Sequence, residues 1–346
     1  MRPYPKVKVA AVQASPVYMN MEASVEKACN LIRKAAAEGV KLIGFPESFL
    51  PRYPYWIWVD DPISTMPYTQ QFFAQALECP GAELAKIASC AKENHIYVCI
   101  GATEREQSSV YDTQFLFGDD GTLLYKHRKL KPMHSEKMLW GEGDASTLSV
   151  ANTPIGRIGS LMSCEHMQPV NSMALCAQRE EIHIASFAAL PDQPANYRDF
   201  STYQILTNCY AISNACYLIF STQVLNEETL NFFSANHPEY AEKIIRGDLE
   251  KAGGRAFVLN PDGEVISNTL AENEEGFVTA KIDLAAIGVA NFFGDTTGHY
   301  CNPVVWLEVD KTHQKVVRVT GKEAAVSIPY ETMIMARTQE TKRDDA

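Results

Sequence analysis

The chain has 346 residues, of which 46% are hydrophobic and 21% are charged, so it is long enough to bury a large core. Its formal net charge of −11 argues against nucleic acid or an anionic membrane as a partner, because both select a basic surface. Without a signal-peptide pattern or an apolar stretch long enough to span a bilayer, a cytoplasmic protein is expected. The nine cysteines contain no CxxC pair and no zinc-type spacing, which predicts reduced thiols and no metal site.

Strands and helices are predicted to alternate along most of the chain. Short segments rich in β-branched residues predict strands over 6–14, 40–45, 96–104, 156–162, 181–187 and 216–222. Segments with helix formers and a helical spacing of apolar residues predict helices over 21–39, 83–95, 169–180 and 197–214. Turn residues predict hairpins over 114–127 and around 260–263.

This alternation indicates an α/β fold in which helices cover a mixed sheet. No linker rich in Pro, Gly or Ser and no internal repeat divides the chain. We therefore expect one domain over residues 1–290. Residues 291–346 lack clear periodicity and end in charged residues, so we expect a tail that contacts a partner subunit and then becomes disordered.

Polar residues follow three of the predicted strands. Glu47 follows the strand over 40–45, Lys129 follows the hairpin over 114–127, and Ser163, Cys164 and Glu165 follow the strand over 156–162. Taken singly, each has an ordinary interpretation as an exposed carboxylate, a solvated basic surface or a thiol that fills the core. Ligands of open α/β sheets, however, bind beyond the carboxyl ends of strands, which makes these residues the first candidates for chemistry.

Together the three clusters suit nucleophilic catalysis. A carboxylate can accept the proton of a thiol, which is the side chain most readily converted to a nucleophile near neutral pH. A lysine beside both groups can keep the carboxylate ionised and stabilise negative charge on the attacked group. Such a set requires no histidine.

Several long motifs, in the same order along the chain, give the sequence a resemblance to the nitrilases, the nitrile-hydrolysing branch of the carbon-nitrogen hydrolase superfamily. They are VAAVQASPVYMN, GFPESFLPRYPYW, HRKLKPMHSEKMLWGEGD, GRIG followed by EHMQP, and GHYCNP. The resemblance implies a four-layer α-β-β-α sandwich and an enzyme without a metal or organic cofactor. It also implies a small-molecule nitrile as substrate and a homodimer or a larger spiral homo-oligomer.

The resemblance assigns roles to four positions. Glu47 would be the general base, Lys129 the catalytic lysine and Glu136 a second glutamate that positions the lysine or a water molecule. In nitrilases a cysteine follows four residues after a glycine and precedes a proline by six. Counting from Gly159 and from Pro169 places Ser163 in this nucleophile position and Cys164 in a position normally held by tryptophan.

Three explanations of Ser163 remain open. It replaces a catalytic cysteine that was changed to arrest turnover, or the neighbouring Cys164 thiol has taken over, or the chain has lost activity and binds a ligand or partner. A serine without a histidine base attacks a nitrile poorly. Successive residues of an extended segment point to opposite faces, however, so we expect the Cys164 sulfur to point away from Glu47 and Lys129 unless a sharp elbow intervenes.

The resemblance further implies a reaction that passes through a covalent thioimidate and an acyl-enzyme to a carboxylic acid and ammonia. Aromatic pockets in related enzymes suggest Tyr53, Trp58, Trp140 and Phe187 as substrate-binding residues, with His166 beside them. Packing or an interface would explain the same aromatic residues equally well. An amidase or carbamoylase of the same superfamily is the enzymatic alternative, and a catalytically inactive binding protein is the alternative from another class.

Overall fold

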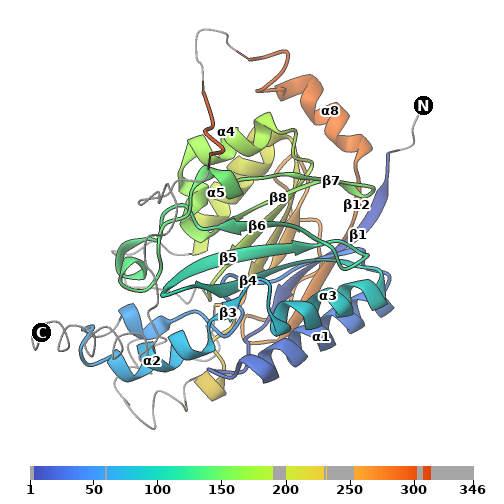
Figure 1. The fold of residues 1–346 in the computed structure, drawn as a ribbon. Coiled ribbons are helices and arrows are strands. Elements are labelled where there is room, and N and C mark those ends of the chain that lie inside the picture. Colours follow the sequence, from blue (N-terminus) through green and yellow to red (C-terminus); the bar gives the residue numbers. More distant parts are fainter. Residues whose placement is uncertain are drawn as a thin grey trace, which may run out of the picture. The chain divides into compact units, whose positions relative to one another are not determined.

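The computed structural model of the chain describes residues 4–58, 61–189, 200–229, 231, 253–301 and 307–312 (Figure 1). Its strands are β1 (Lys6–Gln13), β2 (Leu42–Gly44), β3 (Leu77–Glu78), β4 (Tyr97–Glu106), β5 (Ser109–Phe117), β6 (Leu123–Arg128), β7 (Ala151–Thr153), β8 (Gly156–Met162), β9 (Ile182–Phe187), β10 (Tyr217–Thr222), β11 (Phe257–Leu259) and β12 (Gly276–Asp283). Its α-helices are α1 (Met21–Ala37), α2 (Met66–Gln75), α3 (Ala82–Asn94), α4 (Pro169–Ala177), α5 (Phe200–Asn214) and α8 (Ala285–Gly294). Short 3₁₀ helices include η1 (Tyr55–Trp58), η2 (His134–Met138), η3 (Ala145–Thr147) and η4 (Ser163–Met167).

The strands form two half-sheets that meet at one residue pair. One half has the order β6-β5-β4-β2-β1, with β12 antiparallel to the whole of β1. The other has the order β10-β9-β8-β7, with β11 on the free edge of β10. Gln13 and Thr222 are the pair that joins β1 to β10. The carboxyl ends of the parallel strands β1, β2, β9 and β10 therefore converge, and the candidate site residues follow such ends.

Three apolar layers hold these half-sheets and their helices together. Helices α1 and α3 pack on the outer face of the first half-sheet, and helices α4 and α5 pack on the outer face of the second (Figure 1). Between the half-sheets, Val9 and Leu42 lie in one cluster with Ile184 and Ile219. A side chain added at Gly44 would meet Ile184 at 3.0 Å, so the two half-sheets approach closely there. This arrangement confirms the predicted α/β fold and the four-layer α-β-β-α sandwich.

Most predicted elements are present, with bounds that differ by a few residues. The 114–127 hairpin is confirmed, but its first strand begins five residues earlier, at Ser109. The hairpin near 260–263 consists of β11 and one bridge between Leu259 and Val265. Helix α8 spans residue 290, the predicted domain boundary. Residues 313–346 lie outside the described part of the chain, so the prediction for the tail stays a prediction.

Within the described residues, every helix is too short or too polar to traverse a bilayer.

Candidate active site

Glu47 is held in place by contacts with residues that lie in or just beyond the strands around it. It follows β2 in a tight loop in which Ser48 has a φ of 43°. A side chain at Gly101 of β4 would lie 2.5 Å from the Pro46 carbonyl, so only glycine lets the loop pack directly on that strand. The Glu47 carboxylate accepts the N–H of Ala188 beyond β9 at 3.2 Å. Its carbonyl accepts the side-chain amide of Gln223 beyond β10 at 2.7 Å, so the loop is fixed on both sides.

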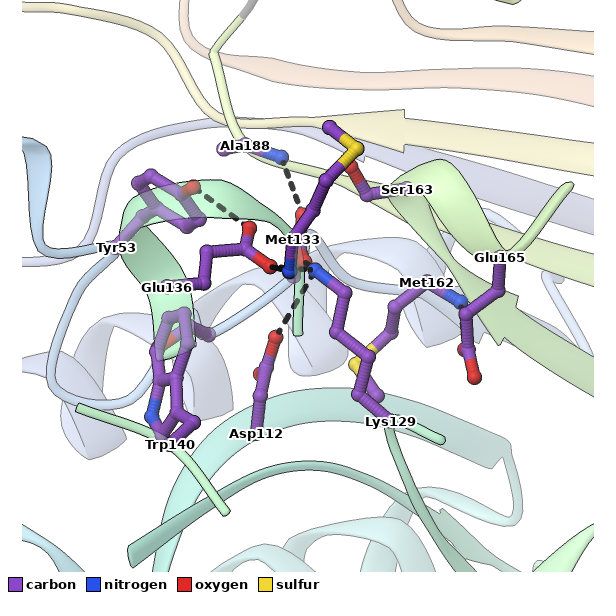
Figure 2. A network of polar contacts seen from close by, with 12 residues as sticks. Tyr53, Asp112, Lys129, Met133, Glu136, Trp140, Met162, Ser163, Glu165 and Ala188 are labelled. Atoms are coloured by element: carbon purple, nitrogen blue, oxygen red, sulfur yellow. Dashed lines mark hydrogen bonds and ion pairs between the residues drawn. The ribbon is translucent and has the colours of Figure 1, made fainter. Parts of the chain in front are cut away.

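Lys129 lies where β6 ends and its ammonium group is the centre of the site (Figure 2). Its Nζ donates to Glu47 Oε1 at 2.5 Å and to Glu136 Oε2 at 2.8 Å. Glu136 lies in η2, where its carboxylate also accepts the backbone N–H of Met133 at 2.7 Å. All three charged side chains are buried, with exposed fractions of 0% for Glu47, 1% for Lys129 and 2% for Glu136. The fold therefore brings together the three residues that the sequence comparison assigned to catalysis.

Burial and mutual charge determine the ionisation of this cluster. Burial raises the pKa of Glu47 above its ordinary value of 4.5; the Lys129 ammonium opposes this rise and Glu136 adds to it. Burial alone would lower the pKa of Lys129, but the carboxylates of Glu136 and Glu47 outweigh it, so this pKa lies well above 10.5. Lysine stays charged, and Glu47 becomes a stronger base than an exposed carboxylate.

Asp112 is a further acidic residue of the site (Figure 2). Its Oδ2 lies 3.8 Å from Lys129 Nζ, and the side chain is fully buried. No described residue donates a hydrogen bond to either oxygen when all carboxylates are ionised, yet the Asp112 and Glu47 carboxyl groups are within hydrogen-bonding reach of each other. Burial, followed by the charge of Glu47, raises the pKa of Asp112 well above 3.8. A proton on Asp112 would satisfy that contact.

Ser163 occupies a sharp elbow between β8 and η4. Its φ is 46°, a left-handed conformation that is uncommon outside glycine and that recurs at strained functional turns. Glu165 ties this elbow to the lysine segment, because its carboxylate accepts the N–H of Met162 at 2.9 Å and the N–H of Leu130 at 2.8 Å. The residues next to Ser163 and next to Lys129 thus share one buried carboxylate.

The Glu165 carboxylate is itself paired with His127. The ring Nε2 lies 3.1 Å from Oε2 and 3.2 Å from Oε1, and because a carboxylate can only accept, Nε2 carries a proton. Burial alone would raise the pKa of Glu165, but His127 and the two backbone N–H groups outweigh burial and lower it below 4.5. An ionised Glu165 therefore fixes the position of the elbow.

The Cys164 side chain is buried, with an exposed fraction of 5%. Burial raises the pKa of its thiol to about 12; the Lys129 ammonium opposes this rise, and Glu136 and Glu47 add to it. Ser163, in contrast, is only partly buried. At neutral pH the Cys164 thiol is therefore protonated and poorly suited to attack.

Three of the predicted aromatic residues lie beside the cluster. Tyr53 donates its hydroxyl to Glu136 Oε1 at 2.7 Å, and Trp58 donates its ring N–H to the Tyr53 hydroxyl at 3.0 Å. The Trp140 ring lies 5.7 Å from the Tyr53 ring. Phe187 does not join them: it packs in the core under α5, 4.4 Å from the ring of Phe220.

His166 is also buried, and it stacks on Phe187 with ring centroids 5.4 Å apart. Its Nδ1 donates to the carbonyl of Ser163 at 2.8 Å, which leaves it behind the elbow in a hydrogen-bonded chain. Burial, followed by the neighbouring His183, lowers its pKa to about 3. The ring is neutral at physiological pH.

Sequence reasoning missed Asp112 and the pairing of Glu165 with His127. In the observed register Thr113 pairs with Arg128, so one more step along the predicted hairpin places Asp112 opposite Lys129. An aspartate just before the apolar segment Phe115–Phe117 was the available signal, since aspartates are rarely buried without a role. His127 belonged to a run of charges that resembled a solvated surface, although the structure buries it.

Comparison with known proteins gives the family. The model of the carbon-nitrogen hydrolase family matches residues 8–292. A nitrilase of Bacillus sp. (strain OxB-1) is 37% identical over 96% of this chain and 96% of its own length. An aliphatic nitrilase of Rhodococcus rhodochrous is 36% identical over 88% of this chain and 83% of its own length. An arylacetonitrilase of Hypocrea virens is 33% identical over 90% and 94%.

Solved structures show the same fold at low sequence identity. Saccharomyces cerevisiae Nit3, a member of branch 10 of the nitrilase superfamily, superposes with a TM-score of 0.65. It is 20% identical, and the match covers 85% of this chain and 96% of that one. A carbon-nitrogen hydrolase from Helicobacter pylori G27 gives a TM-score of 0.63 at 18% identity, over 83% of this chain and 92% of that one.

A fold of this kind, closed around a buried lysine and its carboxylates, defines a hydrolase of carbon-nitrogen bonds. The chain belongs to the carbon-nitrogen hydrolase family, in its nitrilase branch, which confirms the resemblance seen in its motifs.

Among the described residues, no group of three or more His, Cys, Asp or Glu side chains is arranged to hold a metal ion.

Proposed function

We propose that the chain hydrolyses an organic nitrile to a carboxylic acid and ammonia through a covalent intermediate on residue 163. The observation that supports this most is the buried Lys129 ammonium, which contacts Glu47 and Glu136. The backbone of the next residue, Leu130, is tied to the Ser163 elbow through Glu165. A buried cation beside a base can activate a nucleophile and stabilise the charge that its attack creates.

The proposed reaction begins with proton transfer from the nucleophile at position 163 to Glu47. The nucleophile adds to the nitrile carbon while the nitrogen takes up a proton, which gives a thioimidate when the nucleophile is cysteine and an imidate ester when it is serine. A first water adds, the carbon-nitrogen bond breaks and ammonia leaves, so an acyl-enzyme remains. A second water then releases the carboxylic acid. Lys129 stabilises the developing negative charge, and Glu136 holds Lys129 and a water in place.

A panel of nitriles tests this proposal. Ammonia release is measured for aliphatic, aryl and arylacetonitrile substrates and for the matching amides, because the relatives named above include aliphatic nitrilases and arylacetonitrilases. We expect turnover of nitriles above that of amides once position 163 carries cysteine. Faster amide turnover would identify an amidase instead, and binding of nitriles without turnover would identify a binding protein.

The first prediction concerns Cys164. Replacing it by alanine is expected to change the rate of ammonia release by less than about threefold, because its thiol is buried and protonated at neutral pH. The measurement is the steady-state rate on the best nitrile of the panel, with Ser163 and with Ser163→Cys. Loss of activity in Cys164→Ala alone would show that this thiol is the nucleophile.

We also propose that Asp112 keeps its proton at neutral pH. Glu47, Glu136 and Asp112 would otherwise place three negative charges around the single Lys129 ammonium in a buried site. One retained proton reduces that excess of negative charge and lets Asp112 donate to Glu47. In this form Asp112 can return a proton to Glu47 during turnover.

Asparagine at position 112 imitates the protonated carboxyl group, which gives a second prediction. Because the folded chain holds a proton that the unfolded chain releases, the stability of the wild type falls as pH rises above 3.8. In urea denaturation at pH 8, the free energy of unfolding of Asp112→Asn should therefore exceed that of the wild type by on the order of 1 kcal/mol. This difference should shrink toward pH 4.

Asp262→Asn is the matched control, since Asp262 lies exposed in the 260–263 turn. It should show no comparable gain at pH 8. A destabilised Asp112→Asn variant at pH 8 would mean that Asp112 is ionised and pairs with Lys129.

The assembly and location of the chain are proposed from its surface and its thiols. Large apolar side chains are exposed on α5 and α8, namely Ile205, Ile212, Phe292 and Phe293. Apolar patches of this kind suit contacts between copies, so we propose at least a homodimer and an assembly of spiral type. All nine cysteines are free, which suits a reducing cytoplasm. Light scattering coupled to gel filtration tests the oligomer.

A further inference from the structure

A second buried polar network lies behind the elbow, and the mechanism above does not use it. It runs from the Ser163 carbonyl to His166 Nδ1 at 2.8 Å and from His166 Nε2 to His183 Nε2 at 2.9 Å. It continues from His183 Nδ1 to Glu180 Oε1 at 2.8 Å, and the Tyr210 hydroxyl donates to Glu180 Oε2 at 2.7 Å. The four side chains have exposed fractions of 6% for His166, 0% for His183, 4% for Glu180 and 4% for Tyr210.

The acceptors and donors of this network fix where its protons lie. A carbonyl oxygen only accepts, so His166 Nδ1 must carry a hydrogen. His166 is a neutral ring, because burial and His183 lower its pKa to about 3, so its Nε2 is an acceptor. His183 Nε2 must then donate the proton between the two rings. One further proton is shared between His183 Nδ1 and Glu180. With it, every hydrogen bond of this network has one donor and one acceptor.

The surrounding fold is shaped to hold this network. A side chain added at Gly159 of β8 would lie 2.0 Å from Glu180 Oε1, so glycine at this position leaves the space for the carboxylate. Phe187 stacks on the His166 ring, and the Tyr210 ring lies 4.0 Å from the His183 ring. The network is therefore held rigidly within the layer between the second half-sheet and α5.

The end of the network acts on the peptide unit that follows the nucleophile position. That unit contains the Ser163 carbonyl and the Cys164 N–H. A donor on the carbonyl polarises the peptide and strengthens its N–H as a donor, because linked hydrogen bonds reinforce one another. In strand-to-helix elbows the N–H after the nucleophile serves as an oxyanion donor. The same hydrogen bond holds the left-handed backbone of Ser163, whose φ is 46°.

We propose that His166, His183 and Glu180 are positioning residues that hold the elbow peptide and strengthen the Cys164 N–H as a donor to the transition state. This inference rests on the proposed function of residue 163. Within this network, Glu180 selects the tautomer of His183, and His183 selects the tautomer of His166. Only the His166 hydrogen bond touches the elbow.

The kinetic test uses the full chain with Ser163→Cys, so that turnover is fast enough to measure. His183→Phe keeps the aromatic volume beside Tyr210 but removes the donor to His166. We expect kcat on the best nitrile to fall about tenfold or more, with KM within about twofold, because the lost interaction acts in the transition state. Unchanged kcat and KM in a folded His183→Phe variant would overturn the proposal.

Two further variants separate positioning from simple loss of packing. Glu180→Gln keeps the network intact, since its amide can donate to His183 Nδ1 and accept from Tyr210. We therefore expect kcat to stay within about threefold of the parent value. Glu180→Met removes both contacts and should resemble His183→Phe. Tyr217→Phe is the control, because it removes a tyrosine hydrogen bond to the Asp283 carbonyl of β12 without touching the network. Equal losses in Glu180→Gln and Glu180→Met would contradict the assigned proton order.

Nitrogen NMR of ¹⁵N-histidine-labelled protein tests the network without activity. His166 should appear as a neutral ring with its hydrogen on Nδ1, which donates to the Ser163 carbonyl. In His183→Phe the Nε2 signal should shift, because this nitrogen loses the hydrogen bond that it accepts from His183. A His166 ring protonated on Nε2 in the parent protein would refute the inference even if the enzyme were active. If Ser163→Cys fails on every nitrile while the Nδ1–H signal is present, the proposed function fails and the arrangement of the network stands.

Discussion

Replacing Ser163 by cysteine is expected to raise the rate of ammonia release from nitriles by at least about 100-fold, because a thiol ionises far more readily than a hydroxyl. The elbow that carries residue 163 already has its strained conformation, with a φ of 46°, and its neighbours are tied to Glu165. Glu47, whose pKa is raised by burial, is a suitable base for a thiol and too weak a base for an alcohol. The measurement is steady-state ammonia production at pH 7 across the nitrile panel.

Ser163→Ala is the control for this gain. It should be no more active than the chain with serine, since alanine cannot attack at all and the serine hydroxyl attacks far more slowly than a thiol. A trapped covalent adduct at residue 163, seen by intact mass spectrometry of Ser163→Cys after rapid quenching, would locate the nucleophile directly. A Ser163→Cys variant that folds, binds nitrile and still releases no ammonia would rule out the proposed role of this position.

Replacing Lys129 by methionine is expected to abolish turnover in the Ser163→Cys chain, with a loss of about 10³-fold or more in kcat. The substitution keeps the side-chain volume but leaves Glu47 and Glu136 buried without their cation. Removing one partner of a buried ion pair costs about 3–5 kcal/mol, so the free energy of unfolding should fall by this amount at pH 7. Urea denaturation and the nitrile assay measure the two effects separately.

The pH dependence of this loss follows from the carboxyl groups. Without Lys129, the pKa of Glu47 in the folded variant rises further above 4.5, so the folded chain binds a proton that the unfolded chain releases. The stability of Lys129→Met should therefore decrease as pH rises above that value. Lys131→Met is the matched control: this lysine is exposed and pairs with Glu142 on the surface, where such pairs contribute about 0–1 kcal/mol. Equal stability losses in the two variants would contradict a buried, charged Lys129.

The spacing of apolar residues correctly predicted the helices and strands in which that spacing by itself identifies the buried face. The 3.6-residue spacing in 21–39 and the β-branched segments at 6–14 and 216–222 are intrinsic to those segments, and helix α1 and strands β1 and β10 match them closely. Strand β12 was missed. It is half exposed, and its pairing with β1, a partner some 270 residues earlier in the chain, has no local signal.

Pocket residues were harder to anticipate than the lysine and its carboxylates. Tyr53 and Trp140 lie at the cluster, but Phe187 and His166 pack together behind the elbow. Adjacent motif residues point to different layers once the strand ends, since the direction of a side chain there depends on backbone turns such as the one at Ser163. Spacing in the motif did not contain that information.

The sequence alone determined the chemistry available to this protein: which segments form strands, that Glu47, Lys129 and Ser163 follow strand ends, and that the motifs are those of the nitrilase branch. These features depend on residue type and short spacing. Only the tertiary structure decided which groups share a proton or a charge. Asp112 joins the lysine cluster, burial raises the pKa of the Cys164 thiol, and Glu180 reaches the elbow through two histidines. Each of these features arises from burial between layers whose residues are distant in sequence. The loss of water there shifts the pKa of the buried groups, and hydrogen-bond partners from the protein take the place of water.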